Sequence, residues 1–228
     1  MKRLLIALLL AASAGALPAQ QVGYAPSRSP YRDVDMTMEL ALLGGHFSAT
    51  PDPAGVAPQS GQMWSLLYGW HATGPLFLTG SFSRVASVRH VIDPLALNRD
   101  RGTEAWPLYA VDGGMSLALT GDRTYHGFMP ILNVGMGLIS DRHSNSDVGD
   151  YQFGTKFEFV WGASLRYIPF ERWGVRVDLN NRFYSMGYPQ TYYVTGKDGT
   201  TVVSPTLSKS FWRNNPALTI GISYLFSH

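Results

Sequence analysis

The end of the chain constrains the fold more than any other segment. Residues 216–226 read PALTIGISYLF, in which apolar and small or polar positions alternate. One strand face carries Leu218, Ile220, Ile222, Tyr224 and Phe226, and the opposite face carries Thr219, Gly221 and Ser223. The segment therefore predicts a β-strand near the end of the chain with one face suited to lipid.

A short motif lies within this strand. The pattern polar-x-Gly-x-x-aromatic-x-aromatic, formed by Thr219, Gly221, Tyr224 and Phe226, resembles the C-terminal insertion signal of bacterial outer-membrane β-barrels. In that family the last aromatic residue normally ends the chain, whereas two residues follow it here. The resemblance implies a bacterial outer-membrane location, contact with outer-membrane lipid and lipopolysaccharide, and the barrel assembly machinery as a partner during biogenesis.

The beginning of the chain is typical of an exported protein. A basic segment, residues 1–3, precedes an apolar run, residues 4–12, that is too short to span a bilayer. Residues 17–19, Leu-Pro-Ala, are similar to a signal-peptidase site. We therefore expect three regions: a signal peptide (1–20), an N-terminal periplasmic segment (21–33) and an outer-membrane β-barrel (34–228).

Composition excludes several classes of function. With no cysteine, the chain can have neither a lipidated N-terminal Cys nor a disulfide framework nor a thiolate metal site. Its 18 Lys and Arg residues exceed its 16 Asp and Glu residues by two, and the leader contains Lys2 and Arg3. The mature chain is therefore formally neutral, and we expect no nucleic-acid partner.

Period-2 alternation recurs throughout the mature chain. It predicts strands at 34–47, 63–71, 76–88, 107–120, 125–140, 153–168, 174–187 and 210–226. Long connections (48–62, 89–104, 141–152 and 188–209) alternate with short turns (72–75, 121–124 and 169–173). This arrangement predicts an all-β fold, an eight-stranded antiparallel up-and-down transmembrane β-barrel with both termini on the periplasmic side.

Charged residues fall on the predicted inner faces of these strands. They are four acids and four bases: Glu39, Asp112, Lys156, Glu158, Arg166, Arg176, Asp178 and Arg182. Charges inside a narrow barrel must be paired or hydrated. The balance predicts a closed, charge-paired lumen. The alternative is a gated small-solute channel in which Arg and Glu exchange partners, as proposed for the OmpA-like transmembrane barrel family, which this architecture resembles.

A lipid A-modifying hydrolase is a second alternative. Residues 143–145, His-Ser-Asn, are superficially similar to the His-x-Ser-Asn segment of outer-membrane deacylases. In that family His and Ser lie two residues apart on a late strand, whereas here they are adjacent in a loop. Adjacent strand residues face opposite ways, and the corresponding segment of the seventh strand, 181–185, has no histidine. We therefore assign no catalytic residue and do not expect an enzyme.

Metal and cofactor sites have little support in the sequence. Asp141, Asn145, Asp147 and Asp150 could offer oxygen ligands to Ca²⁺, but Arg142 interrupts them and EF-hand spacing is absent. No glycine-rich segment precedes a helix in the manner of a phosphate loop. We expect neither a metal nor a cofactor.

The longest loop is the remaining candidate for function. Aromatic and polar residues gather in it or beside it, as on adhesive surfaces: Tyr188, Tyr192, Tyr193, Trp212 and Arg213. We expect Tyr188 and Trp212 to belong to the outer aromatic girdle, and the roles of Tyr192 and Tyr193 stay open. The sequence favours a structural or surface-interaction protein, and it does not identify the partner of its extracellular loops.

Overall fold

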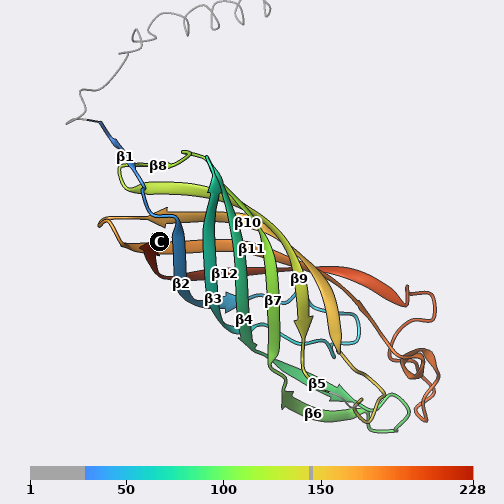
Figure 1. The fold of residues 1–228 in the computed structure, drawn as a ribbon. Coiled ribbons are helices and arrows are strands. Elements are labelled where there is room, and N and C mark those ends of the chain that lie inside the picture. Colours follow the sequence, from blue (N-terminus) through green and yellow to red (C-terminus); the bar gives the residue numbers. More distant parts are fainter. Residues whose placement is uncertain (1–28, 144–145, 228) are drawn as a thin grey trace, which may run out of the picture.

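Eight long antiparallel strands close into a barrel in the computed structural model, which describes residues 29–143 and 146–227 (Figure 1). The strands are β2 (Met38–Phe47), β3 (Gly61–Thr73), β4 (Leu76–Ala86), β7 (Leu108–Ala118), β9 (Phe128–Ser140), β10 (Thr155–Tyr167), β11 (Trp173–Gly187) and β12 (Ser210–Phe226). β12 pairs with β2, and β7 pairs with β9, so the ring has no open edge. The predicted fold is confirmed. The expected signal peptide lies outside the described residues.

Four shorter strands lie at the two ends of the barrel. β1 (Tyr31–Asp33) pairs with β8 (Arg123–Tyr125), and β5 (Val88–Ile92) pairs with β6 (Asp100–Ala105). The segment predicted as the loop 89–104 is therefore largely a hairpin that projects beyond the membrane. Part of the predicted N-terminal segment forms a ribbon with the predicted turn at 121–124. The longest loop contains a 3₁₀ turn, η2 (Gln190–Tyr193).

Inward-facing and outward-facing side chains alternate along the strands. On β3, Trp64 is 56% exposed while its neighbour Met63 is 4% exposed. On β4, Phe77 faces inward while Leu78 and Phe82 face outward. The first barrel strand begins at Met38 rather than at residue 34, because residues 34–37 have no ladder partner on β12. Among the described residues there is no helix long and apolar enough to cross a membrane.

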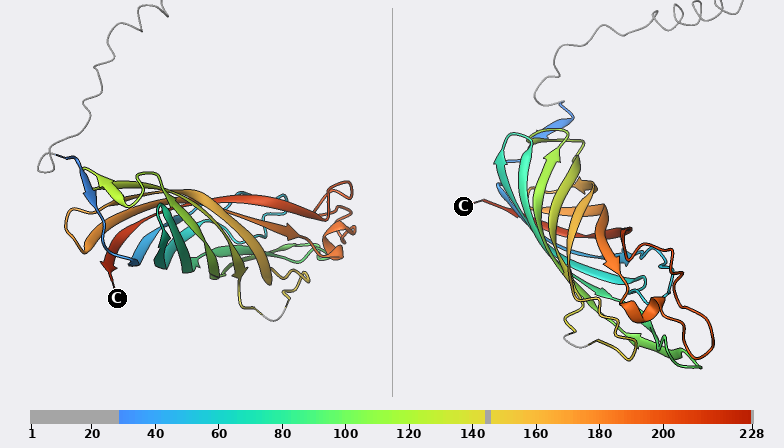
Figure 2. Two further views of the ribbon diagram at one scale, coloured as in Figure 1. Left: turned by 45° about the horizontal axis from the view of Figure 1, so that its top comes forward. Right: turned by 90° about the vertical axis from the view of Figure 1, so that its right-hand side faces the viewer.

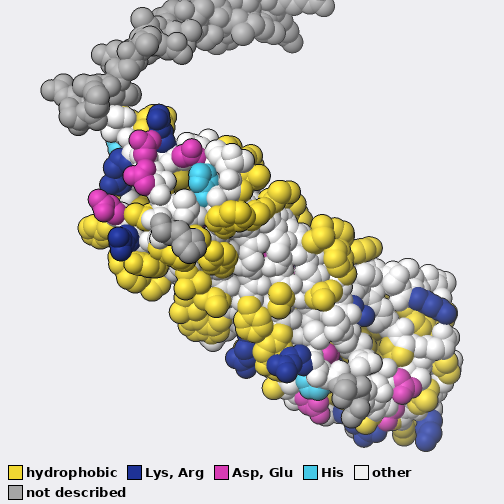
Figure 3. All heavy atoms as spheres, in the orientation of Figure 1, with side chains coloured by type: hydrophobic (Ala, Val, Ile, Leu, Met, Phe, Trp, Pro, Cys, Tyr) yellow, Lys and Arg dark blue, Asp and Glu magenta, His cyan; other side chains and the backbone are white. Residues whose placement is uncertain are grey.

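The outer surface of the barrel carries an apolar belt (Figure 3). Ring pairs mark the two edges. The outer girdle contains Phe82, Tyr109, Phe157, Phe159, Phe183 and Trp212, and the periplasmic girdle contains Phe128, Tyr167, Trp173, Tyr224 and Phe226. A continuous apolar belt of this extent would not be stable in water, and it fits the hydrocarbon core of a bilayer.

The two ends of the barrel differ in form. Residue 29 and the C-terminal end of the chain lie at the same end, beside β1 and β8 (Figures 1 and 2). The long connections and the β5–β6 hairpin gather at the opposite end. By the usual arrangement of outer-membrane barrels, the end with short turns is periplasmic and the end with long loops is extracellular.

Candidate functional site

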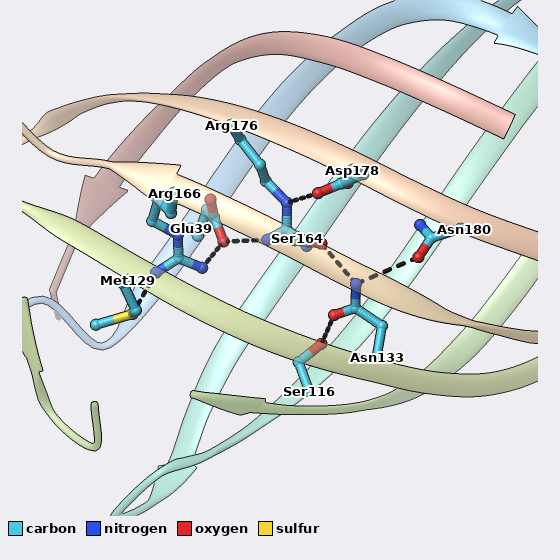
Figure 4. A network of polar contacts seen from close by, with 9 residues as sticks. All are labelled: Glu39, Ser116, Met129, Asn133, Ser164, Arg166, Arg176, Asp178 and Asn180. Atoms are coloured by element: carbon cyan, nitrogen blue, oxygen red, sulfur yellow. Dashed lines mark hydrogen bonds and ion pairs between the residues drawn. The ribbon is translucent and has the colours of Figure 1, made fainter. Parts of the chain in front are cut away.

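The lumen contains an inner ionic layer near its periplasmic end, formed by Glu39, Arg166, Arg176 and Asp178 (Figure 4). The Glu39 carboxylate pairs with Arg166 and also accepts a hydrogen bond from Arg176 at 3.0 Å. Arg176 Nε donates to Asp178 at 2.7 Å. All four side chains are buried. Two acids and two bases make this layer formally neutral.

Neutral polar side chains continue from this layer toward the middle of the barrel (Figure 4). Arg176 donates to Ser164 Oγ at 3.2 Å, and Asn133 Nδ2 donates to the same oxygen at 2.5 Å. Asn133 also contacts Asn180 at 3.3 Å and accepts from Ser116 at 2.8 Å. These contacts link side chains on four neighbouring strands, β7, β9, β10 and β11.

An outer ionic layer lies above these residues and consists of Asp112, Glu158 and Arg182. Arg182 donates to Glu158 at 2.5 Å and to Asp112 at 3.0 Å. The strand register aligns Asp112, Gly137 and Glu158 on three neighbouring strands. A Cβ on Gly137 would lie 2.6 Å from Asp112 Cβ, so the glycine leaves space between the two carboxylates. Arg182 bridges that gap.

The structure brings seven of the eight predicted lumen charges, all in its described part, into these two layers. Lys156 does not join them: it is half-buried near the extracellular end of β10 and has no ion pair with a described residue. Lys156 occupies an inward-facing position of the strand, but it lies too near the extracellular rim to join either ionic layer. Arg213 lies on β12, within the predicted strand 210–226 and next to the longest loop as expected, but its side chain is buried in the lumen and it was not counted among the lumen charges. Its inward parity along β12 is the signal that could have identified it.

Little free space remains between the ionic layers. The described side chains leave a cavity of about 50 Å³, lined in part by Ser116, Asn133, Asp178 and Asn180. A polar cavity of this size can accommodate only a few water molecules and is too small for most solutes. An eight-stranded barrel is only wide enough for its own side chains to fill it.

The four residues of the predicted insertion signal lie on the strand that closes the barrel. Thr219 and Gly221 face inward, and a Cβ on Gly221 would come within 1.9 Å of the Leu42 carbonyl oxygen. Tyr224 stacks on Phe226 and contacts the tilted ring of Trp173 in the periplasmic girdle. The close approach of β12 and β2 explains the glycine, and the recognition of this motif during assembly stays a prediction.

The extracellular loops pack over the lumen as a folded layer, here called the loop layer (residues 48–60, 87–107, 141–143, 146–154 and 188–209). At its centre Arg89 is fully buried between the rings of Trp106 and Tyr151, with its Cζ 4.5 and 4.6 Å from their centroids. Arg89 pairs with Asp147, whose other oxygen accepts the backbone N–H groups of Gly149 and Tyr151. One cation thus joins the second and third loops.

Tyr188 and Tyr192 belong to the loop layer and not to the girdle. Their rings stack at 5.6 Å, and Tyr188 is only 7% exposed, so the expectation of a girdle position for it was wrong. Its hydroxyl donates to Asp52 at 2.6 Å, which ties the first loop to the fourth. Burial, together with that hydrogen bond, raises the pKa of Tyr188. Tyr193 is half-buried, and Trp212 lies in the outer girdle as expected.

Three of the residues considered for hydrolysis or metal binding, Asp141, His143 and Asp147, contact other loop residues. His143 stacks on Trp106 at 3.7 Å, and Ser144 and Asn145 lie outside the described residues. Asp141 accepts from the Trp106 indole at 2.9 Å, and Asp147 faces Arg89. In the described part of the chain, no three His, Asp or Glu side chains are grouped as ligands for a metal.

Comparison with known proteins gives similarities of overall shape. Neisserial surface protein A has 13% identity over 83% of this chain and 97% of that chain, with a TM-score of 0.49. OprG from Pseudomonas aeruginosa has 11% identity over 85% and 98%, with a TM-score of 0.47. Ail from Yersinia pestis has 14% identity over 83% and 99%, with a TM-score of 0.40. The sequence matches no protein-family model and no curated protein.

At these levels of identity and TM-score, the similarities carry no inference about activity. The location follows from the molecule itself, because a closed barrel with a lipid-facing belt and two aromatic girdles has the features of outer-membrane barrels. The chain is a small eight-stranded β-barrel protein of the bacterial outer membrane.

Proposed function

We propose that this protein is a closed scaffold whose lumen does not conduct and whose loop layer presents a rigid interaction surface outside the cell. The observation that carries the proposal is the pair of ionic layers, in which Glu39 and Arg182 each contact two partners of opposite charge across the lumen. Opening a path would separate buried ion pairs, which costs several kcal/mol for each uncompensated charge.

The loop layer supports the interaction half of the proposal. Its apolar residues, among them Val56, Tyr151, Tyr192 and Val203, form one cluster with lumen residues such as Phe47. A loop that shares a core with the barrel is held in one shape, and a preformed surface loses little entropy when it binds a partner. A groove of about 440 Å³ opens on this surface, between residues such as His90, Arg99 and Val202.

Recording in planar bilayers tests the closed lumen. Wild-type protein should give no ion-current steps. The alternative function, a gated small-solute channel, requires such steps. The hydrolase alternative requires a loss of acyl chains from lipid A, which mass spectrometry of lipid incubated with the protein would detect. Current steps or deacylation by the wild type would each contradict the proposal.

Crosslinking in intact cells tests the interaction surface. A photo-crosslinking residue at Thr201, which lines the groove, should trap a discrete partner. The same residue at Glu171, on a periplasmic turn, serves as the matched control and should not trap that partner. Identical products at both positions would contradict an extracellular interaction surface.

A further inference from the structure

Two arginines stand on either side of Tyr109 at the extracellular edge of the apolar belt. Arg84 lies on β4 directly opposite Tyr109 on β7, and Tyr109 is in turn opposite Ser140 on β9. Arg142 follows β9 by two residues, and its Cζ lies 5.4 Å from the centroid of the Tyr109 ring. Arg84 and Arg142 therefore lie on opposite sides of Tyr109, and the Arg142 guanidinium lies over the Tyr109 ring.

The position corresponds to the height of lipid headgroups. Phe82 is the lipid-facing residue that precedes Arg84 on β4. Its ring stacks on the Tyr109 ring with 6.4 Å between the centroids, so Phe82 and Tyr109 both belong to the outer girdle. Arg84 is the next lipid-facing residue after Phe82 and lies about 7 Å farther along the strand toward the extracellular end. Figure 3 shows Lys and Arg side chains at the border between the apolar belt and the extracellular end. Aromatic girdles mark the level at which hydrocarbon gives way to headgroups.

Neither guanidinium has an acceptor among the described residues. Arg84 and Arg142 are both exposed, and neither side chain makes an ion pair or donates a hydrogen bond within residues 29–143 and 146–227. Three other partly or largely exposed arginines do: Arg99, Arg101 and Arg123 pair with Asp198, Asp93 and Asp33. The two arginines beside Tyr109 therefore offer unused donors at a surface that faces lipid headgroups.

The backbone of Arg142 gives a second, independent observation. Its φ is +58°, in the left-handed region that side chains other than Gly and Asn rarely adopt. The Arg142 N–H donates to Ser140 Oγ at 3.2 Å, and this turn directs the guanidinium onto Tyr109. The strained turn thus positions a cation beside a ring at the membrane edge.

We propose that Arg84, Tyr109 and Arg142 form a binding site for the phosphate group of an outer-leaflet glycolipid of the lipid A type. Guanidinium groups match the geometry of phosphate oxygens and bind them through two donors at once, and the Tyr109 hydroxyl supplies a further donor. The acyl chains of the same lipid would lie along the apolar belt below. The site is on the outer surface, so it does not depend on a closed lumen or on the groove of the loop layer.

Lipid retention by the purified full-length protein tests the proposal. Bisphosphorylated lipid A is added to the protein in detergent micelles, and the bound fraction is measured by native mass spectrometry. The double variant Arg84→Gln/Arg142→Gln should retain at least about tenfold less than the wild type, because each charge-assisted hydrogen bond is typically worth a factor of ten or more. Arg172→Gln, which removes an exposed charge on a periplasmic turn, should retain as much as the wild type.

Two further measurements separate the phosphate site from other causes. A heat-modifiable gel shift checks that both variants are folded barrels. Lipid A from which the phosphates have been removed should bind weakly, and equally, to the wild type and the double variant. Unchanged retention by the double variant, or equal retention of the dephosphorylated lipid by the wild type, would overturn the proposal. Displacement of lipid A by inorganic phosphate at a similar concentration would overturn the lipid assignment.

Discussion

Replacing Glu39 by Gln should destabilise the barrel strongly, because this carboxylate is shared by two buried arginines. The side chains of Glu39 and Arg166 are each 2% exposed. After the substitution Arg176 keeps Asp178 as a partner, but Arg166 loses its ion pair. It keeps a 3.8 Å contact with Met129 Sδ and the Phe77 ring, whose centroid lies 5.5 Å from its Cζ. The inner ionic layer would change from neutral to one uncompensated positive charge. Breaking a buried pair in this way costs about 3–5 kcal/mol.

The measurement is urea unfolding of the protein in lipid vesicles, followed by the fluorescence of its six Trp residues. A double-mutant cycle with Glu39→Gln and Arg166→Met isolates the pair, and we expect a coupling free energy of about 2 kcal/mol or more. The control is Asp33→Asn, which breaks an ion pair whose two side chains are 68% and 62% exposed and which should cost about 1 kcal/mol or less. A cost for Glu39→Gln no larger than that of the control would refute the paired-lumen reasoning.

Three further predictions concern assembly, strand facing and the loop layer. Phe226→Ser should leave exported but unassembled protein in the periplasm, because Phe226 is the last aromatic residue of the proposed insertion signal; a wild-type yield of heat-modifiable protein in the outer membrane would contradict this. Leu179→Arg should cost about 2–4 kcal/mol near the bilayer midplane, since Leu179 faces lipid, and Asn180→Arg should cost less unless the lumen rejects its volume. Equal labelling of cysteines at 179 and 180 by a lipid-phase reagent would refute that facing. Burial raises the pKa of Tyr188 and Tyr192 above the ordinary value of 10, so the stability that they contribute is present below pH 10 and is lost as the pH rises through their folded-state pKa values. Tyrosinate absorbance should show these residues ionising after the exposed tyrosines, and ionisation together with them would contradict a packed loop layer.

Strand number and facing could be predicted because both depend on local information. Inward and outward positions alternate with period 2, and a shift of one residue would put Trp64 or Leu179 into the lumen. The eight strands therefore follow from the sequence with small errors at their ends. The β5–β6 hairpin was missed for two reasons. β6 is exposed on both faces, and on β5 one of the buried positions is the charged Arg89, so no apolar period marks the two strands.

The pairing of the lumen charges could not be predicted from parity. Glu39 meets Arg166, 127 residues away, because the tilt of the strands brings β2 and β10 to the same height in the barrel. Whether a residue faces inward or outward does not give its height along the barrel axis. For this reason Lys156 was placed in the charge network although it lies at the rim. Tyr188 was misplaced for a related reason: the inward alternation of β11 continues one residue past the strand and carries its ring over the lumen.

The central claim is that side chains close the lumen between the two ionic layers, and the accessibility of one thiol tests it most directly. The chain has no cysteine, and Ser116 is 3% exposed within the neutral polar region, so Ser116→Cys places a single thiol there. Ser204→Cys in the longest loop and Ser227→Cys beyond β12 are exposed controls for the two sides of the membrane. A water-soluble, membrane-impermeant thiol reagent should label both controls and leave the cysteine at 116 unlabelled from either side. Labelling at 116 at a rate close to that of either control would contradict a closed lumen.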